Sequence, residues 1–466
     1  MKLNGIIITA VGLFLMGAAW GSAQQLYDLG ALTAAAVKTD PDIQRLESGI
    51  AVDQAGLAGA RASALPTVSF LNTYSYIANP QAPYVLQAGS LGSIPIAPGK
   101  SVALPQSDVT VVDGQDDKAF NFGLSIDQPI FLWGKIKSNI ALKEKLVLSD
   151  GLQVRKQRDE TSTMVAVNLY SLYYLEKIEG LLEEQKRVAD DLLTIARDSL
   201  KAGQINDSSL IEKRMTTDQI AHAILGVSDQ RETALRNLRY LTGIDSLKSD
   251  EISFKGIDEN LAARGLPGEA ELMARAAREN SDLKLLQLSQ QIHQGKIDIA
   301  SADTPLKPDL ALNVQLGYKG SRVPGLESEW DTKDLWYANV TLAINANIFD
   351  GGKARSAVDA ARAQKAQTGY QVDATLRQVQ QYISETSYEL GVIRQNIDYY
   401  RQRAKDTQDI VAYQKRLLDI GSGSRLDYYQ KRVDTFTEQT QVLQQKLSYA
   451  TRYLTLMNVV GAPAGQ

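Results

Sequence analysis

The stretch NIFDGGKARSAVDAARAQK, from Asn347 to Lys365, joins a strand-like run to a long helix-like run. A related stretch, PIFLWGKIKSNIALKEK, lies between Pro129 and Lys145, at an offset of 218 positions. The chain therefore contains the same kind of joint twice, and the distance between the copies predicts a large internal duplication.

Other landmarks keep the same offset from about residue 120 to residue 243 without a gap. Gly203 corresponds to Gly421, and Gly243 corresponds to Gly461. The earlier parts of the halves also correspond, at a different offset: TDPDIQRL resembles ENSDLKLL, and SALPTVSF resembles PLKPDLAL. The first half carries an extra loop, mostly between Asn79 and Lys118. We predict a tandem duplication of a unit of about 220 residues, too long for a solenoid repeat.

Within each half the patterns predict helix, strand, strand, long helix, turn, helix. Strict alternation of apolar and polar residues predicts strands near 66–78, 119–130, 308–320 and 336–349. Helical spacing predicts helices near 32–64, 134–200, 207–241, 270–302, 353–420 and 425–460. Pro66 and Pro308 stand where helix changes to strand, because a residue before proline avoids the helical region. Asp350 is expected to cap a helix starting at Gly351, whereas the first copy has Leu132 there and lacks this cap.

The N-terminus predicts an export signal. Lys2 precedes an apolar run from Ile6 to Trp20, and small residues follow, so residues 1–23 are interpreted as a signal peptide cut after Ala23. An N-terminal anchor is the alternative, but the run is shorter than the roughly 20 residues that span a bilayer.

Composition argues against several classes of function. The formal charge of −4 comes without a basic block, so nucleic acid is not an expected partner. There are no cysteines, which excludes thiol chemistry and disulfides. There are only two histidines, His222 and His293. No G-x-S-x-G or phosphate loop occurs, so an enzyme has little support, and no catalytic, cofactor or metal residue is expected.

The strands leave two interpretations open. In a soluble α+β domain their apolar faces would pack on helices. Three observations argue against this. The polar faces carry almost no charge apart from Asp127, the strands are long enough to cross a bilayer when tilted, and aromatic residues gather at the strand ends. Strands in lipid need closed edges, and known barrels begin at eight strands, so four strands would have to share a barrel with other copies of the chain.

The signal peptide, the duplicated halves, the QPIFLWGK and IFDGGKAR joints and the L-x-x-G…D turns together resemble the TolC-like outer-membrane factor family. The resemblance implies an α+β membrane protein and a homotrimer. Each chain would give four strands to a twelve-stranded outer-membrane β-barrel, continuous with a long periplasmic α-helical barrel. It divides the chain into a first repeat at 24–243, a link at 244–268 in an equatorial belt, and a second repeat at 269–466.

The resemblance also implies a function and its partners. The family is a passive exit duct for tripartite efflux pumps and type I secretion systems. Its members dock with a periplasmic adaptor and an inner-membrane pump of the RND or ABC type, while the strands contact outer-membrane lipid. Its cargo can be drugs, dyes, metals or proteins, and no catalysis or cofactor is implied.

The sequence suggests three groups of site residues: strand–helix joints, which follow from the residues themselves, and helical tips and a gate, which follow from positions that match the family. The helical tips, which would contact the adaptor or be ordinary glycine-capped turns, are Leu200, Gly203, Ile205, Asp207, Leu418, Gly421, Gly423 and Leu426. The strand–helix joints are Pro66, Pro129, Gly134, Lys135, Pro308, Asp350, Gly352 and Lys353, with both lysines at the inner membrane rim.

The third group is a periplasmic gate of Asp427, Gln430 and Arg425. Asp427 matches the first of two gate aspartates, and three copies would narrow the pore and favour cations. Alternatively Asp427 is a plain helix-start residue. The second family aspartate falls on Gln430, and a latch arginine falls on Gly423, with Arg425 nearby.

The alternative to a conduit is a periplasmic coiled-coil scaffold without a pore.

Overall fold

The computed structural model describes residues 26–323, 325–326, 328 and 335–463. The predicted signal peptide lies outside the described residues. The chain forms two compact units, and each draws on both sequence halves. The strand unit comprises Ser48–Gly151 and Leu285–Val372, and the helical unit comprises Leu152–Lys284 and Asp373–Gln466 together with the residues up to Glu47.

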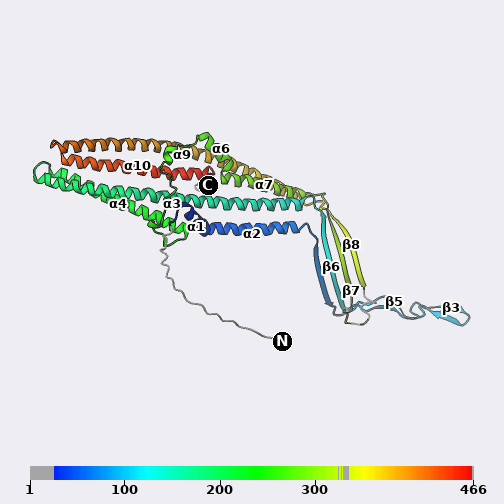
Figure 1. Cartoon of the computed structure of the whole chain (residues 1–466). Helices are drawn as coiled ribbons and strands as arrows, with labels where there is room; N and C mark the ends of the chain where they lie inside the picture. The colour runs from blue at the N-terminus through cyan, green and yellow to red at the C-terminus, as the bar shows by residue number, and fades with distance from the viewer. Residues whose placement is uncertain (1–25, 324, 327, 329–334, 464–466) are drawn as a thin grey trace, which may run out of the picture. The chain divides into compact units, whose positions relative to one another are not determined.

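The strand unit contains a four-stranded sheet in the order β1-β6-β7-β8 (Figure 1). Every neighbouring pair is antiparallel. The strands are β1 (Thr67–Tyr76), β6 (Lys118–Phe131), β7 (Asp309–Gly320) and β8 (Leu335–Asn345). The alternating pattern located all four strands. Strand β8 ends at Asn345, before the predicted residue 349, because residues 346–349 no longer pair with β7.

The segment between β1 and β6 is more ordered than the predicted loop. It forms two small antiparallel sheets, β2 with β5 and β3 with β4. We call this segment, residues 77–117, the arm. The β3–β4 hairpin lies at its far end in Figure 1. The strands are β2 (Tyr84–Leu86), β3 (Ser93–Ala97), β4 (Lys100–Ala103) and β5 (Val109–Val112). Their shortness and their prolines hid them from a search for long alternating runs.

Four long helices follow the predicted ranges to within one or two residues: α3 (Lys135–Lys201), α4 (Asp207–Thr242), α9 (Lys353–Asp419) and α10 (Arg425–Val459). At 1.5 Å per residue, a helix the length of α3 is about 100 Å long. Each is followed by a glycine within two residues, as at Gly243, which has a left-handed backbone that other residues avoid.

The helix predicted at 32–64 is wrong, because the structure divides it into α1 (Leu29–Thr39) and α2 (Pro41–Ala62). Asp40 separates them, and its Oδ1 accepts hydrogen bonds from the backbone N–H groups of Asp42 and Ile43 at 2.8 and 3.3 Å. Pro41 forces the break, since the residue before a proline leaves the helical region.

The helix predicted at 270–302 is wrong as well, because the structure divides it at a capping residue. It consists of α6 (Glu269–Glu279) and α7 (Ser281–Ala302). Asn280 stands between them, and its Oδ1 accepts the N–H of Leu283 at 3.0 Å. The break is therefore duplicated along with the elements that flank it.

The helical unit has a core that the two halves repeat. One cluster contains Leu32, Leu172 and Leu238, all fully buried. A second contains Leu272, Leu390 and Leu456, which occupy the same places in the second half. The link between halves adds a short 3₁₀ turn, η1 (Ser249–Glu251), and α5 (Leu261–Arg264). Duplicated sequence thus yields duplicated packing.

None of the helices in the described ranges combines the length and apolar character needed to span a membrane.

Candidate functional site

One face of the four-stranded sheet is apolar, and most of its side chains are exposed or half-buried. Phe70 on β1 is 66% exposed and Val340 on β8 is 73% exposed. Isolated apolar side chains on a surface are ordinary, but a contiguous apolar face of this extent needs a covering medium. The face consists of Val68, Phe70, Tyr74, Phe120, Phe122, Leu124, Ile126, Leu310, Leu312, Val314, Leu316, Tyr318, Trp336, Val340, Leu342 and Ile344.

Aromatic side chains on this face gather at one end of the sheet. Phe122 stacks on Tyr318 with ring centroids 5.3 Å apart, and Trp336 meets Tyr318 edge-on, also at 5.3 Å. Tyr318 is fully buried and donates its hydroxyl to the carbonyl oxygen of Arg322 at 2.9 Å. The predicted aromatic end of the strands is therefore one packed cluster.

The opposite face of the sheet is polar and nearly uncharged. The side-chain amide of Asn313 donates to Ser125 Oγ at 3.0 Å and to Asp127 Oδ1 at 2.5 Å. Further along, Tyr337 lies over Gly317, where an added Cβ would stand 2.6 Å from the ring. Tyr337 follows Trp336 of the aromatic cluster in the sequence, but its ring covers glycines of the polar face.

The two outer strands of the sheet have free edges. Within the described residues, β1 pairs only with β6, and β8 pairs only with β7. Each outer edge therefore offers unpaired backbone N–H and C=O groups along a strand of ten or more residues.

The first joint, between β6 and α3, is fixed by an ion-pair cluster. Lys135 Nζ lies 2.7 Å from Asp303 Oδ1 and 2.9 Å from Asp309 Oδ2. Partial burial lowers the pKa of Lys135, but hydrogen bonds and attraction from the two carboxylates outweigh it, and the net pKa is raised. Trp133 Nε1 also donates to the carbonyl oxygen of Pro308 at 2.9 Å. These contacts attach the first joint to the start of β7.

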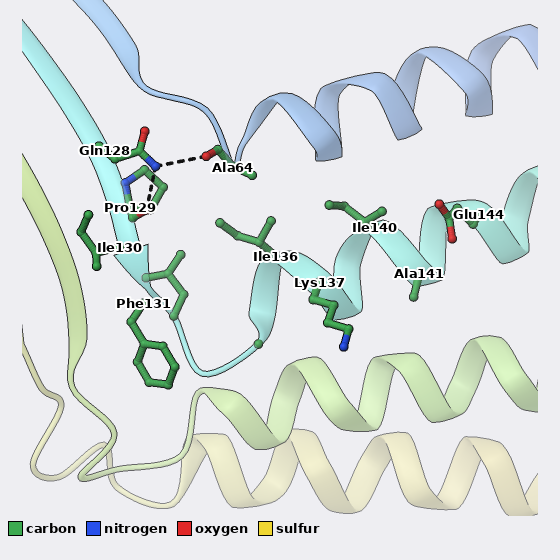
Figure 2. A pocket seen from close by; sticks show the side chains of 12 residues that line it. Ala64, Gln128, Pro129, Ile130, Phe131, Ile136, Lys137, Ile140, Ala141 and Glu144 are labelled. Atoms are coloured by element: carbon green, nitrogen blue, oxygen red, sulfur yellow. Dashed lines mark hydrogen bonds between the residues drawn. The ribbon is translucent and has the colours of Figure 1, made fainter.

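A groove of about 730 Å³ lies beside this joint (Figure 2). Ile136 and Ile140 of α3 give it an apolar lining, with Lys137 and Glu144 also among its residues. The amide of Gln128 donates to the carbonyl oxygen of Ala64 at 3.1 Å, which ties the connection between α2 and β1 to β6. Pro66 immediately precedes β1, and Pro129 lies within β6 at a register shift.

The second joint, between β8 and α9, has the predicted cap but a different start. Helix α9 begins at Lys353, not Gly351, because Gly351 and Gly352 both adopt left-handed conformations. Asp350 accepts from the N–H groups of Gly352 and Ala354 at 2.9 and 2.8 Å.

The first joint uses the same backbone path with a different residue. Gly134 is left-handed, and so is Trp133, the counterpart of Gly351, at φ 52°. A non-glycine residue avoids this region unless its surroundings hold it there.

The two helical turns of the helical unit are alike in detail. The N–H of Gly203 donates to the carbonyl oxygen of Leu200, and the N–H of Gly421 donates to that of Leu418. Both glycines are left-handed, so the turns are glycine-capped helix ends. The next helices are capped by Asn206 and Ser424.

The remaining tip residues differ in accessibility. Asp207 is the exposed first residue of α4, and Ile205 precedes the cap. Leu426 packs inward against a cluster that includes Val433, so it supports the turn more than it presents a surface. Gly423 has no room for a side chain, since a Cβ there would lie 2.6 Å from the backbone nitrogen of Leu418.

The three predicted gate residues have separate environments. Asp427 is exposed, and its backbone N–H donates to Ser424 Oγ at 3.2 Å, so it does sit in the first turn of α10. Gln430 is engaged within the chain, accepting from Lys213 Nζ at 2.7 Å. Arg425 is exposed at the start of α10. In one chain these groups do not form a cluster.

The partners of the predicted residues were not evident from the sequence. Asp303 and Asp309 complete the cluster around Lys135, yet only the sheet order brings them close. Comparing the halves does not reveal them, because Thr67 stands in the first half at the place of Asp309. No group of three or more His, Asp or Glu side chains that could hold a metal occurs in the described part of the chain.

Comparisons with known proteins agree with this architecture. Residues 32–244 and 272–462 match the family described as outer membrane efflux protein. The outer membrane efflux protein BepC of Brucella suis biovar 1 (strain 1330) is 20% identical over 342 residues, which is 73% of this chain and 71% of BepC. The outer membrane protein TolC of Escherichia coli (strain K12) is 20% identical over 382 residues, 78% of this chain and 75% of TolC. The solved Campylobacter jejuni CmeC outer membrane channel matches with a TM-score of 0.66 and 17% identity, over 99% of this chain and 94% of that one.

Proposed function

The chain belongs to the outer membrane efflux protein family, and we propose that three copies of it form one exit duct. The family's members are outer-membrane efflux channels, and the location of this chain is the outer membrane, with a large periplasmic portion. In the proposed duct the sheets join into one twelve-stranded barrel, and substrates cross the outer membrane through it without a chemical step.

The observation that carries the proposal is the sheet with two free edges and an exposed apolar face. In a bilayer an unpaired strand edge is costly, because no water can satisfy its backbone groups. Four strands are too few to close on themselves, and lipid is the medium that fits an apolar face of this kind. Sharing the barrel among copies satisfies both requirements, and the polar, nearly uncharged face then lines the lumen.

The helical tips are the proposed docking site for a periplasmic adaptor, which would connect the duct to an inner-membrane pump of the RND or ABC type. The exposed residues Gly203, Asp207 and Gly421 are the ones best placed for this contact. Leu200 and Leu418 accompany them as partly buried supports.

Asp427 is the proposed gate residue. Its exposure leaves the carboxylate available to face the axis in an assembly of three copies. Three carboxylates near one axis would attract cations and narrow the passage. Gly423 cannot supply a latch, because its position has no space for a side chain, so Arg425 is the remaining candidate.

The proposal is tested by expressing the full chain in a Gram-negative host and separating the membranes. We expect the protein in the outer-membrane fraction, migrating as a trimer in unheated detergent gels and as a monomer after heating. A soluble monomer that never reaches this fraction would contradict the duct and favour a periplasmic scaffold.

A further inference from the structure

The groove beside the first joint continues the apolar face of the sheet. Gln128 and Phe131 of β6 both line it. They pair with Leu312 and Leu310 of β7, which belong to the apolar face, and directly opposite residues of an antiparallel pair lie on the same face. The groove therefore begins where the apolar surface of the sheet meets the first turns of α3 (Figure 2).

This end of the sheet is the periplasmic end. The long helices form the periplasmic portion of this outer-membrane protein, and β6 ends at Phe131 just before α3 starts at Lys135. Trp133 stands between them, and tryptophan is enriched where a membrane meets water. The periplasmic leaflet of an outer membrane consists of phospholipid, so acyl chains and phosphate groups are the chemical groups nearest to the groove.

The lining of the groove is mostly apolar. Ile136 and Ile140 line it as half-buried side chains, and Ile130 and Phe131 extend the lining toward the sheet. Its volume of about 730 Å³ falls within the roughly 300–1,000 Å³ that is typical of small-molecule sites. These side chains offer an acyl chain a continuous apolar contact from the membrane onto α3.

One charged group of the lining has no partner within the described chain. Glu144 is paired with Arg61, whose Nη2 lies 2.8 Å from Glu144 Oε1. Lys137 is exposed, and its ammonium group makes no hydrogen bond or ion pair with any described residue. In Figure 2 its side chain points away from β6, along α3. The groove thus presents a cation beyond its apolar end, which matches the order of chain and phosphate in a phospholipid.

The position of the groove does not favour a second copy of the chain as its occupant. The groove lies between the connection that leads into β1 and the end of β6, and these two strands pair with each other within one chain. The edges that remain free for another copy are the far edge of β1 and the outer edge of β8. A boundary between copies at those edges leaves the groove open to lipid.

The second joint does not repeat this lining. At the offset of 218 positions, Ala354 and Val358 take the places of Ile136 and Ile140, and both are buried. Arg355 takes the place of Lys137 and is exposed. The second joint therefore keeps the positive charge without the accessible apolar side chains, which makes it a control for the first.

We propose that the groove binds one phospholipid of the periplasmic leaflet, with an acyl chain along Phe131 and Ile136 and the phosphate at Lys137. The site lies within a single chain. It depends on the location of the protein in the outer membrane and on no particular number of copies, so its test counts lipids per chain.

Native mass spectrometry of the full chain, purified in detergent, tests the site with dioleoyl phosphatidylglycerol as the probe. Lys137→Glu reverses the charge that meets the phosphate, and Ala141→Trp fills the groove from an exposed position of α3. The matched controls are Arg355→Glu and Asp359→Trp, at the same places of the second joint. We expect the unsubstituted protein and both controls to retain one lipid per chain. Each test variant should need on the order of tenfold more lipid for the same occupancy.

Two further probes separate the parts of the ligand. Dioleoylglycerol has the chains without the phosphate and should bind the unsubstituted protein on the order of tenfold more weakly. Inorganic phosphate has the charge without the chains and should not displace the lipid. Equal binding of dioleoylglycerol, or displacement by inorganic phosphate, would overturn the assignment.

The variants give the remaining outcomes. No lipid retained by the unsubstituted protein would overturn the proposal, and so would equal retention by the unsubstituted protein and the test variants. A loss of lipid from the controls as large as that from Lys137→Glu and Ala141→Trp would also overturn it. Circular dichroism identifies any variant that has lost its helices, and the other test variant then decides the result.

Discussion

At the scale of single residues, the polar face of the sheet depends on glycines beneath a tyrosine. An added Cβ at Gly317 would stand 2.6 Å from the ring of Tyr337 and 2.8 Å from the carbonyl oxygen of Phe122. At Gly123 the corresponding distance to Tyr337 Oη is 3.3 Å. One glycine is thus required by close packing, while the other has a little more room.

Gly317→Ala should destabilise the folded trimer by about 1–3 kcal/mol, the usual cost of overpacking. Gly123→Ala is the matched control and should cost clearly less. The temperature at which the trimer dissociates in detergent gels measures both. Equal effects of the two substitutions would show that the tyrosine packing does not decide the stability.

Asp40 is a second residue whose environment sets its chemistry. Partial burial raises the pKa of this carboxyl, but hydrogen bonds from Thr161, Gln157 and two backbone N–H groups outweigh it, so the net pKa is lowered. A lowered folded-state pKa contributes stability above the unfolded-state pKa, and that contribution is lost as the pH falls through the folded-state pKa.

Asp40→Ala should therefore cost about 1 kcal/mol at neutral pH, because the cap of α2 is lost. The difference from the unsubstituted protein should shrink as the pH falls below about 4. Asp40→Asn is the control, since Asn280 caps the equivalent helix in the second half. Thermal unfolding followed by circular dichroism at neutral and at acidic pH checks this, and a pH-independent difference would contradict it.

At the scale of elements, the sequence was most informative where a pattern was long. The helices near 134–200 and 353–420 were predicted closely, because their spacing is sustained and proline is absent. Asp350 was recognised as a cap because its residue type and place suffice. Short features were missed. The break at Asp40 follows from the single residue Pro41 inside a long helical pattern, and the arm strands are too short for alternation to show. The ion pairs of Lys135 depend on the order of strands, which one sequence does not state.

Substituting the lysines of the two joints should affect the stability of the trimer to different degrees. Lys135→Gln leaves Asp303 and Asp309 without their cation, so the first joint should loosen and the trimer should dissociate at a lower temperature. Lys353→Gln is the matched control, because Lys353 makes no ion pair with any described residue. Both variants can be compared in one heat-modifiability series. A larger effect at Lys353 would be evidence against the attachment of β6–α3 to β7.

A substitution at the helical tips should weaken contact with the adaptor without preventing the trimer from assembling. Asp207→Lys reverses an exposed charge at the start of α4 and should weaken co-purification of a co-expressed periplasmic adaptor. Lys255→Glu, at an exposed residue of the link, is the control for a surface charge reversal. Equal recovery of the adaptor with both variants would move the docking site away from the tips.

At the scale of the whole molecule, duplication explains why four strands and four long helices come from one chain. Each half supplies one hairpin, one long helix and one shorter helix, and the capped breaks and the core leucines are repeated with them.

The extra arm between β1 and β6 is the clearest departure from this symmetry. Its deletion should therefore leave the assembly intact, which unheated gels can check.

The proposed gate makes a prediction for the assembled duct. Asp427→Asn should reduce the preference for cations over anions, because three carboxylates near the axis would be neutralised. Asp198→Asn, next to the first turn, is the control, since Asp198 is paired with Lys201 at 3.3 Å. Reversal potentials in a salt gradient give the selectivity. An unchanged selectivity in the Asp427 variant would remove this residue from the gate.

The central claim is that copies of this chain together enclose a water-filled passage through the outer membrane. The most direct measurement is the ionic current through a planar lipid bilayer after addition of the purified, detergent-extracted trimer. We expect discrete conductance steps of uniform size, absent when the protein has been heated to monomers beforehand. Trimers that insert into the bilayer yet pass no current, with Asp427 either intact or replaced by asparagine, would contradict the claim.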